Sequence, residues 1–223
     1  MPSYSGVFTL QTQMQAKAAS NWPVFIPAIG AAYEGGFFAG QIGVGGVATH
    51  NLVIGPVASA ENSSKQWKNA GTATAGADSD INGPQNTADI VADGNSTVYP
   101  AAHFCNDLVI GGYSDWYMPA KNEIEVCYYN LKPTTASNNT SVGINANAVP
   151  ARASNYTAGT PAQTSATNFK SPSGTEYITA GYYWSSTENS ATNAWLKLFS
   201  DGNQYGYDKT TSVRVRAIRR VAV

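Results

Sequence analysis

Charged side chains are scarce in this sequence. They make up 12% of its 223 residues, about half the roughly 25% found in an average soluble protein. The 13 Lys and Arg residues against 14 Asp and Glu residues leave a formal net charge of −1. No broad positive field would therefore attract a phosphate backbone or an anionic bilayer. We expect neither nucleic acid nor a membrane surface as a partner.

Long apolar runs and a leader segment are also missing. The N-terminus has no basic segment followed by an apolar core, and Pro27 and Glu34 interrupt the most apolar stretch, residues 23–48. A membrane-spanning helix needs about 20 consecutive apolar residues. The sequence thus predicts neither a signal peptide nor membrane insertion.

Cysteine and histidine are rare. Cys105 and Cys127 have no C-x-x-C neighbour, which argues against a cysteine metal cluster. Two buried free thiols are the favoured interpretation, and one disulfide between two helices stays open as the alternative. His50 and His103 are the only histidines, and a hydrolytic triad would have to use one of them. We expect no enzymatic activity.

Short apolar runs predict strands in the first quarter of the chain. Residues 37–44 and 52–55 are partly β-branched and bounded by glycine, which is typical of buried strands. Residues 1–25 lack an apolar stripe and are interpreted as an N-terminal arm. The polar stretch from Ser59 to Asn95, around Trp67, is expected to be an elaborated loop.

Two helices are expected in the middle of the chain. Pro100 suits a first helical position, and spacing of i, i+3, i+4 and i+7 follows in each helix, at Ala101, Phe104, Cys105 and Leu108 and again at Ile124, Cys127, Tyr128 and Leu131. Glu123 and Glu125 are two apart in the second helix and project to different faces, so they cannot form a catalytic pair. Residues 132–172 lack sustained periodicity and predict a long surface insertion.

The end of the chain predicts further strands. Asp201-Gly202 is a turn signal between two of them, and the alternation of Val213 and Val215 with Arg214 and Arg216 is typical of a half-buried strand. The basic cluster of the C-terminus is therefore interpreted as part of a closing strand with charged side chains against polar neighbours. This cluster comprises Arg214, Arg216, Arg219 and Arg220.

Two blocks of the sequence resemble the collagen-like adhesin C-terminal (Lcl C-terminal) domain family. The segment 112–119 reads Gly-Tyr-Ser-Asp-Trp-Tyr-Met-Pro, and the segment 183–188 reads Tyr-Trp-Ser-Ser-Thr-Glu, followed by Asn193-Ala194-Trp195 and Val213 to Arg219. The resemblance implies an α+β, C-type-lectin-like (formylglycine-generating-enzyme-like) fold over residues 26–223, with two helices packed on small antiparallel sheets and long loops. The cysteine pair of the formylglycine-generating enzymes is missing, because no cysteine follows Cys127.

Loop residues near the C-terminus are the candidate ligand-binding groups. The resemblance implies an exposed face at residues 190–198 and 203–209, and rigid aromatic rings there offer a large contact area at small entropic cost. Trp195 has a second interpretation as a core residue of the family. The candidate residues are Asn189, Asn193, Trp195, Lys197, Asn203, Tyr205 and Tyr207.

One segment resembles a calcium-binding loop. Its D-x-D-x-N-G pattern starts at Asp78, includes Asp80 and Asn82, and reaches Asp89 at the twelfth position. Calcium is the sole cofactor that we consider, and an Asx-rich turn is the alternative. The lectin triplets Glu-Pro-Asn and Gln-Pro-Asp do not occur, so lectin-type sugar coordination is not expected.

The resemblance and the low-charge composition together predict a non-enzymatic phage virion protein. We expect a tail-fibre or tail-tip adhesin for a host cell-surface receptor, made in the host cytoplasm without a signal peptide and carried on the particle surface. The N-terminal arm would bind other virion proteins, and a homotrimer suits this setting. A head-fibre or capsid-decoration protein is the alternative, and a bacterial surface adhesin domain is the second.

Overall fold

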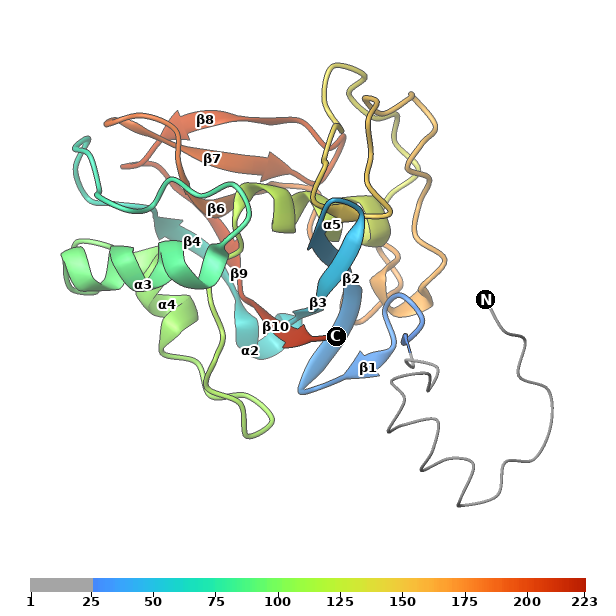
Figure 1. Ribbon diagram of the computed structural model, residues 1–223, viewed down its shortest axis with the longest axis horizontal. Coiled ribbons are helices and arrows are strands. Elements are labelled where there is room, and N and C mark those ends of the chain that lie inside the picture. The colour runs from blue at the N-terminus through green and yellow to red at the C-terminus, as the bar shows by residue number, and fades with distance from the viewer. Residues whose placement is uncertain (1–25) are drawn as a thin grey trace.

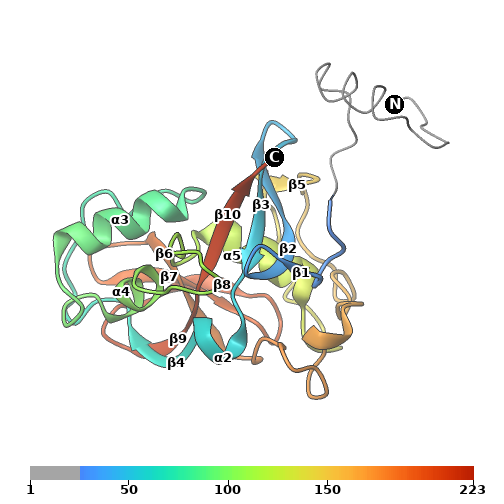
Figure 2. The ribbon, with the colours of Figure 1, turned by 90° about the horizontal axis from the view of Figure 1, so that it is seen from below.

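The computed structural model describes residues 26–223, so the predicted arm at residues 1–25 lies outside the described residues. The described chain is a mixed α+β structure with two curled, largely antiparallel sheets and few helices (Figures 1 and 2). The predicted α+β class is therefore confirmed.

The first sheet joins the two ends of the described chain. Its strands are β1 (Ala32–Tyr33), β2 (Gly36–Val44), β3 (Val47–Ile54) and β10 (Ile218–Ala222), in that order, and β5 (Ala148–Val149) pairs with β2. Gly45 and Gly46 connect β2 to β3 with φ angles of +60° and +80°, as a tight hairpin turn of type I′ requires. The strands predicted at 37–44 and 52–55 are confirmed as β2 and the end of β3.

The second sheet contains the C-terminal strands. Its order is β4 (Glu61–Gln66), β9 (Ser212–Arg216), β6 (Tyr182–Glu188), β7 (Asn193–Leu198) and β8 (Gln204–Asp208). β6 and β9 run parallel and share the single register pair Tyr183 and Arg214, while the other pairs are antiparallel. The predicted turn between β7 and β8 is confirmed, with Gly202 at φ +78°.

The two predicted helices are confirmed as α4 (Pro100–Asn106) and α5 (Lys121–Leu131). The prediction of a loop from Ser59 to Asn95 is wrong, because this stretch contains the second half of the short helix α2 (Val57–Ala60), β4 and the eleven-residue helix α3 (Gly83–Asp93). Asn82 caps α3 by accepting the amide of Gln85. Polar positions on the buried side of α3, such as Asn86 and Thr87, hide its periodicity.

Two apolar cores lie on either side of the second sheet. α5 packs on β2 of the first sheet and on β6 and β7 of the second, whereas α3 packs on α4 and β6 (Figure 1). Residues 132–181 have only β5 and the 3-10 turn η1 (Thr167–Phe169) as regular elements. This stretch is nevertheless more than a surface insertion, because Ala148, Tyr156 and Phe169 are buried in the core around α5.

Buried lysines hold three irregular segments in place. Each ammonium group donates hydrogen bonds to main-chain carbonyl oxygens, which satisfies both the buried cation and the loop backbone. The bonds run from Lys68 Nζ to Ala73 O (2.8 Å), from Lys132 Nζ to Pro161 O (3.2 Å), and from Lys209 Nζ to Thr72 O and Ala191 O (2.9 Å each). We call these three residues the anchoring lysines.

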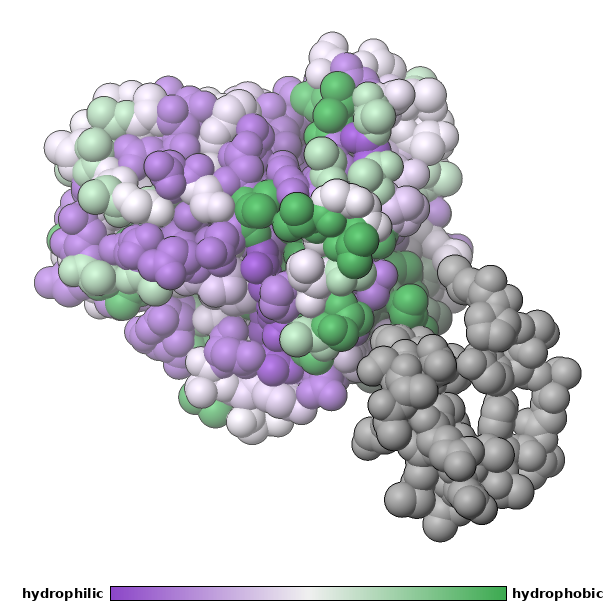
Figure 3. Space-filling model, viewed as in Figure 1, coloured by the Kyte–Doolittle hydropathy of each residue, from purple (hydrophilic) through white to green (hydrophobic). Residues whose placement is uncertain are grey.

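The face of the molecule drawn in Figure 3 is mostly polar. Figure 3 shows polar residues over α3 and apolar residues gathered around the β2–β3 hairpin, where Val44 and Val47 are 64% and 69% exposed. Within residues 26–223, no helix has the length and apolar character needed to cross a membrane.

Candidate ligand-binding surface

The predicted binding residues do not form one surface. Side chains alternate between the faces of a strand, and β7 and β8 are paired so that Trp195 lies opposite Gly206 and Ala194 lies opposite Tyr207. Tyr205 and Tyr207 therefore share one face of the sheet, while Trp195 lies on the other. The β7–β8 hairpin presents two different surfaces.

Three tyrosines meet on the first of these surfaces. Tyr182 of β6 stacks on Tyr207 with ring centroids 6.1 Å apart and nearly parallel planes (9°), and Tyr205 contacts both rings edge-on at 6.2 and 6.1 Å. Tyr182 is 41% exposed, whereas Tyr205 and Tyr207 are half-buried against the core under α3 and α4. Burial, and after it the Tyr182 hydroxyl, raises the pKa of Tyr205. We call this set the tyrosine surface.

Tyr182 was missing from the sequence prediction. Its position two residues before Trp184 places both side chains on the same face of β6, and this spacing is the signal that could have found it. A shallow hollow of about 230 Å³ adjoins Tyr182 and is also lined by Ser63 and Arg214. It lies beside the point where β6 and β9 share only one register pair.

The opposite face of the hairpin carries Trp195. This ring is half-buried under the ammonium group of Lys121, which lies 4.0 Å from the ring centroid and 3.3 Å from the Asp80 carboxylate. The exposed side chain of Asn189 packs against Gly206 of the same hairpin. A β-carbon added to Gly206 would lie only 2.4 Å from Asn189 Oδ1. Trp195 is therefore neither a fully buried core residue nor a neighbour of the tyrosine surface.

The two remaining asparagines are used in turns. Asn193 lies at the start of β7, and its carbonyl accepts the amides of Asn189 and Ser190. Asn203 Oδ1 accepts the Gln204 amide at 2.9 Å. Both are half-buried.

Lys197 was predicted to contact a ligand and is instead fully buried. Its ammonium group lies 4.8 Å from the centroid of the Tyr128 ring and donates a hydrogen bond of 3.1 Å to the Tyr156 hydroxyl. Burial lowers the pKa of Lys197 to about 8. The prediction failed because Tyr156, which covers this lysine, comes from the irregular stretch after α5.

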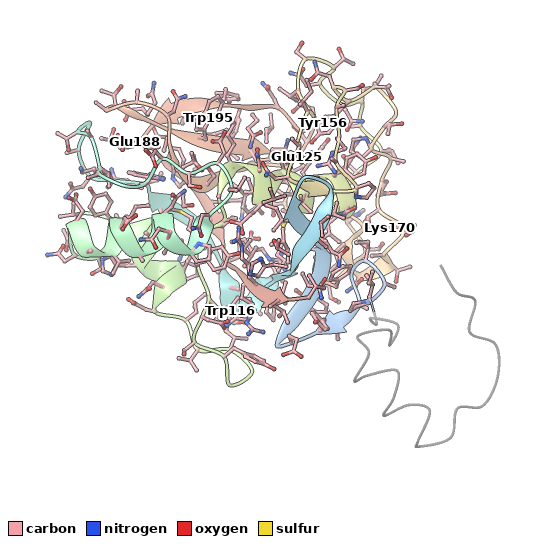
Figure 4. All side chains as sticks on the ribbon, in the orientation of Figure 1. Trp116, Glu125, Tyr156, Lys170, Glu188 and Trp195 are labelled. Carbon is pink, nitrogen blue, oxygen red and sulfur yellow. The ribbon has the colours of Figure 1, made fainter. Side chains whose placement is uncertain are left out.

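Lys197 belongs to a buried polar network centred on Glu125. The Glu125 carboxylate accepts hydrogen bonds from the Tyr156 hydroxyl, from Arg152 and from Asn145 Nδ2, the last at 2.5 Å. Figure 4 shows Glu125 on α5 and Tyr156 beside it. Burial raises the pKa of Tyr156, with Glu125 as the next cause. No sequence motif announced this network.

Glu123 holds a separate network on another side of α5, as its spacing from Glu125 predicts. Its carboxylate accepts the Tyr117 hydroxyl (2.6 Å), the Ala120 amide (2.8 Å) and the Gly83 amide (3.1 Å), and it pairs with Arg220 at 2.6 Å. Glu123 is completely buried, and burial raises its pKa against the opposing effect of Arg220.

The four residues predicted to bind calcium, Asp78, Asp80, Asn82 and Asp89, do not come together as one metal site. Asp80 pairs with Lys121, Asn82 caps α3, and Asp89 lies on that helix, where its carboxylate accepts Gln85 Nε2 at 2.9 Å. In the described part of the chain, no three His, Cys, Asp or Glu side chains gather in a way that would hold a metal, so Asp78, Asp80 and Asp89 do not form such a group.

The basic C-terminal cluster is neutralised by carboxylates. Arg214 and Arg216 pair with Glu61, Arg219 pairs with Asp115 at 2.7 Å, and Arg220 pairs with Glu123. The interpretation as a closing strand is confirmed. Cys105 and Cys127 are both buried and free, which confirms the favoured interpretation of these thiols.

A comparison with family models identifies the domain. The model of the Lcl C-terminal domain matches residues 60–219. This chain belongs to the Lcl C-terminal domain family. The match includes α3 to α5 and all strands from β5 to β9, so the tyrosine surface and the Glu125 network lie within the Lcl C-terminal domain.

A solved structure with similarity to the chain is a fimbrial protein from Bacteroides ovatus ATCC 8483. The TM-score is 0.45 at 13% sequence identity, over 75% of this chain and 35% of that chain. The chain thus spans about a third of the fimbrial protein, and a similarity of this size does not decide the fold or the function. No curated protein sequence matches the chain.

Proposed function

We propose that this protein is a non-enzymatic surface adhesin whose Lcl C-terminal domain binds a receptor on a cell surface through the tyrosine surface. The observation that carries the proposal is the set of contacting rings of Tyr182, Tyr205 and Tyr207 on one face of the second sheet, with Tyr182 exposed and the other two half-buried. Tyrosine is enriched where proteins bind partners, because a rigid ring with a polar tip loses little entropy on binding.

We infer a C-type-lectin-like arrangement, supported by the pairing of β10 with β3 and by helix α5, which packs on β2 of the first sheet and on β6 and β7 of the second. The setting that fits the weakly charged composition is a phage particle, with the protein in the tail fibre or tail tip. There the protein would form a homotrimer and bind other virion proteins through residues 1–25. A head-fibre or capsid-decoration role is the second candidate.

Receptor binding is tested with Tyr182→Ala. Because Tyr182 is 41% exposed, its truncation should leave the melting temperature within about 2 °C while weakening adsorption of the labelled protein to host cells by at least about fivefold. Tyr177→Ala, which removes a half-buried tyrosine elsewhere, is the matched control. Equal adsorption of both variants would refute the role of the tyrosine surface.

Immunogold electron microscopy tests the setting. Antibody against this chain should label the tail end of native phage particles. Label over the head would favour the head-fibre role, and unlabelled particles would refute both virion roles and leave a cellular adhesin.

A further inference from the structure

A second hollow lies beside the Glu125 network and shares no lining residue with the tyrosine surface. It has a volume of about 270 Å³ and is lined by Tyr129 of α5, by Arg152 to Thr157 and by Thr160. Small-molecule sites are typically about 300–1,000 Å³ in volume, so this hollow suits a ligand of the size of one sugar or one amino acid.

We infer that this hollow binds a small organic carboxylate, recognised by Arg152 at its base and by the hydroxyl and amide groups of residues 154–160 on its wall. The inference does not depend on the proposed receptor role of the tyrosine surface. Three features of the hollow support it: an excess positive charge at the base, the unpaired Nε of Arg152, and neutral polar side chains on the wall.

The charge beneath the hollow is not balanced. Arg152 pairs with Glu125, and Lys197 donates to the Tyr156 hydroxyl, which itself donates to the Glu125 carboxylate. Two cations thus share one carboxylate, so one positive charge remains. The single negative charge of Glu125 is paired with Arg152 and cannot also neutralise Lys197. An excess positive charge at the base of a hollow favours an anionic ligand.

The guanidinium group of Arg152 has a donor to spare. Its Nε is the one buried side-chain nitrogen or oxygen of residues 26–223 without a hydrogen-bond partner, and such a donor is costly to leave unpaired. The group is held in place by Glu125 and by the Tyr129 ring, whose centroid is 4.1 Å from Arg152 Cζ. A fixed guanidinium is the group that proteins commonly use for carboxylates.

The wall of the hollow supplies neutral polar groups for the rest of the ligand. Ser154, Asn155 and Thr160 are exposed and line it, and Thr157 Oγ1 accepts the Thr160 amide at 2.9 Å, which leaves its own hydrogen free to donate. Such groups bind ligand hydroxyls without adding charge, so the selectivity for an anion comes from Arg152.

The test is an NMR titration of the full chain with sodium glucuronate and, separately, with glucose, two sugars that differ in the carboxylate. We expect glucuronate to shift the amide signals of residues 152–160 with a dissociation constant on the order of 1 mM, and glucose to leave them unchanged. Equal shifts with glucose, or no saturable shift with glucuronate, would overturn the inference.

A variant at the rim tests whether glucuronate binds in this hollow, and it leaves Glu125 unchanged. Asn155→Asp places a negative charge at the exposed rim and should weaken glucuronate binding by about fivefold, as expected for a like charge about 8 Å away in a partly screened site. Asn69→Asp makes the same change in net charge at an exposed position after β4, outside the residues that line the hollow. Equal affinities of the two variants would mean that the ligand binds elsewhere, against the inference.

Discussion

Replacing Lys197 with methionine tests how the buried ammonium group affects stability. Burial lowers the pKa of Lys197 from its ordinary 10.5 to about 8. Between these values the unfolded chain binds more protons than the folded chain, so the contribution of Lys197 to stability rises with pH. Burial of the charged Lys197 ammonium group destabilises the folded state fully below pH 8, and this destabilisation disappears as the pH rises toward 10.5.

The size of the effect follows from the two pKa values. Between pH 7 and pH 9, the free energy of unfolding of the wild type should gain about 1.3 kcal/mol relative to Lys197→Met. Methionine keeps a long, flexible side chain in the same space and has no proton to bind.

Urea unfolding of both proteins at pH 7 and pH 9 measures this gain. Comparing the two proteins removes the contributions of Cys105, Cys127 and the tyrosines outside the network, because these groups titrate in both. A difference between the proteins that is the same at both pH values would refute the buried, uncompensated state of Lys197.

Two further results are expected. Glu123→Gln should lower the free energy of unfolding, measured with urea, by about 3 kcal/mol, because it leaves Arg220 without its buried partner. The control Glu34→Gln alters a partly exposed pair and should lower it by less than about 1 kcal/mol. Equal losses in the two variants would contradict the importance of burial for the Glu123 pair. Millimolar calcium should leave the melting temperature unchanged, because Asn82 caps α3 and Asp89 accepts Gln85 Nε2, whereas a rise of several degrees would revive the calcium hypothesis.

Secondary structure could be predicted where burial is apolar and local. The stripe around Cys127 gave α5 with correct bounds to within a few residues, since the side chains that face the core there are mostly apolar. α3 could not be found in this way. Its buried Asn86 and Thr87 are satisfied by Ser79 O and Met118 O, and such partners are set by tertiary structure.

The candidate site was only half predictable for a related reason. Tyr205 and Tyr207 were predicted because rigid aromatic rings in a glycine-containing turn offer a large contact area at small entropic cost. Lys197 was misjudged because a lysine in an alternating strand usually faces solvent, whereas its acceptor, the Tyr156 hydroxyl, is 41 positions away in the chain. The residues that decide burial at such a position cannot be inferred from the strand alone.

The anchoring lysines bear on how freely the loops can change. Lys68, Lys132 and Lys209 donate hydrogen bonds to carbonyl oxygens of the backbone, and every amino acid has that atom. Substitutions at the loop tips therefore leave these hydrogen bonds intact as long as the backbone path is kept. A surface built in this way can acquire new side chains, and with them new binding partners, while the lysines beneath it stay the same.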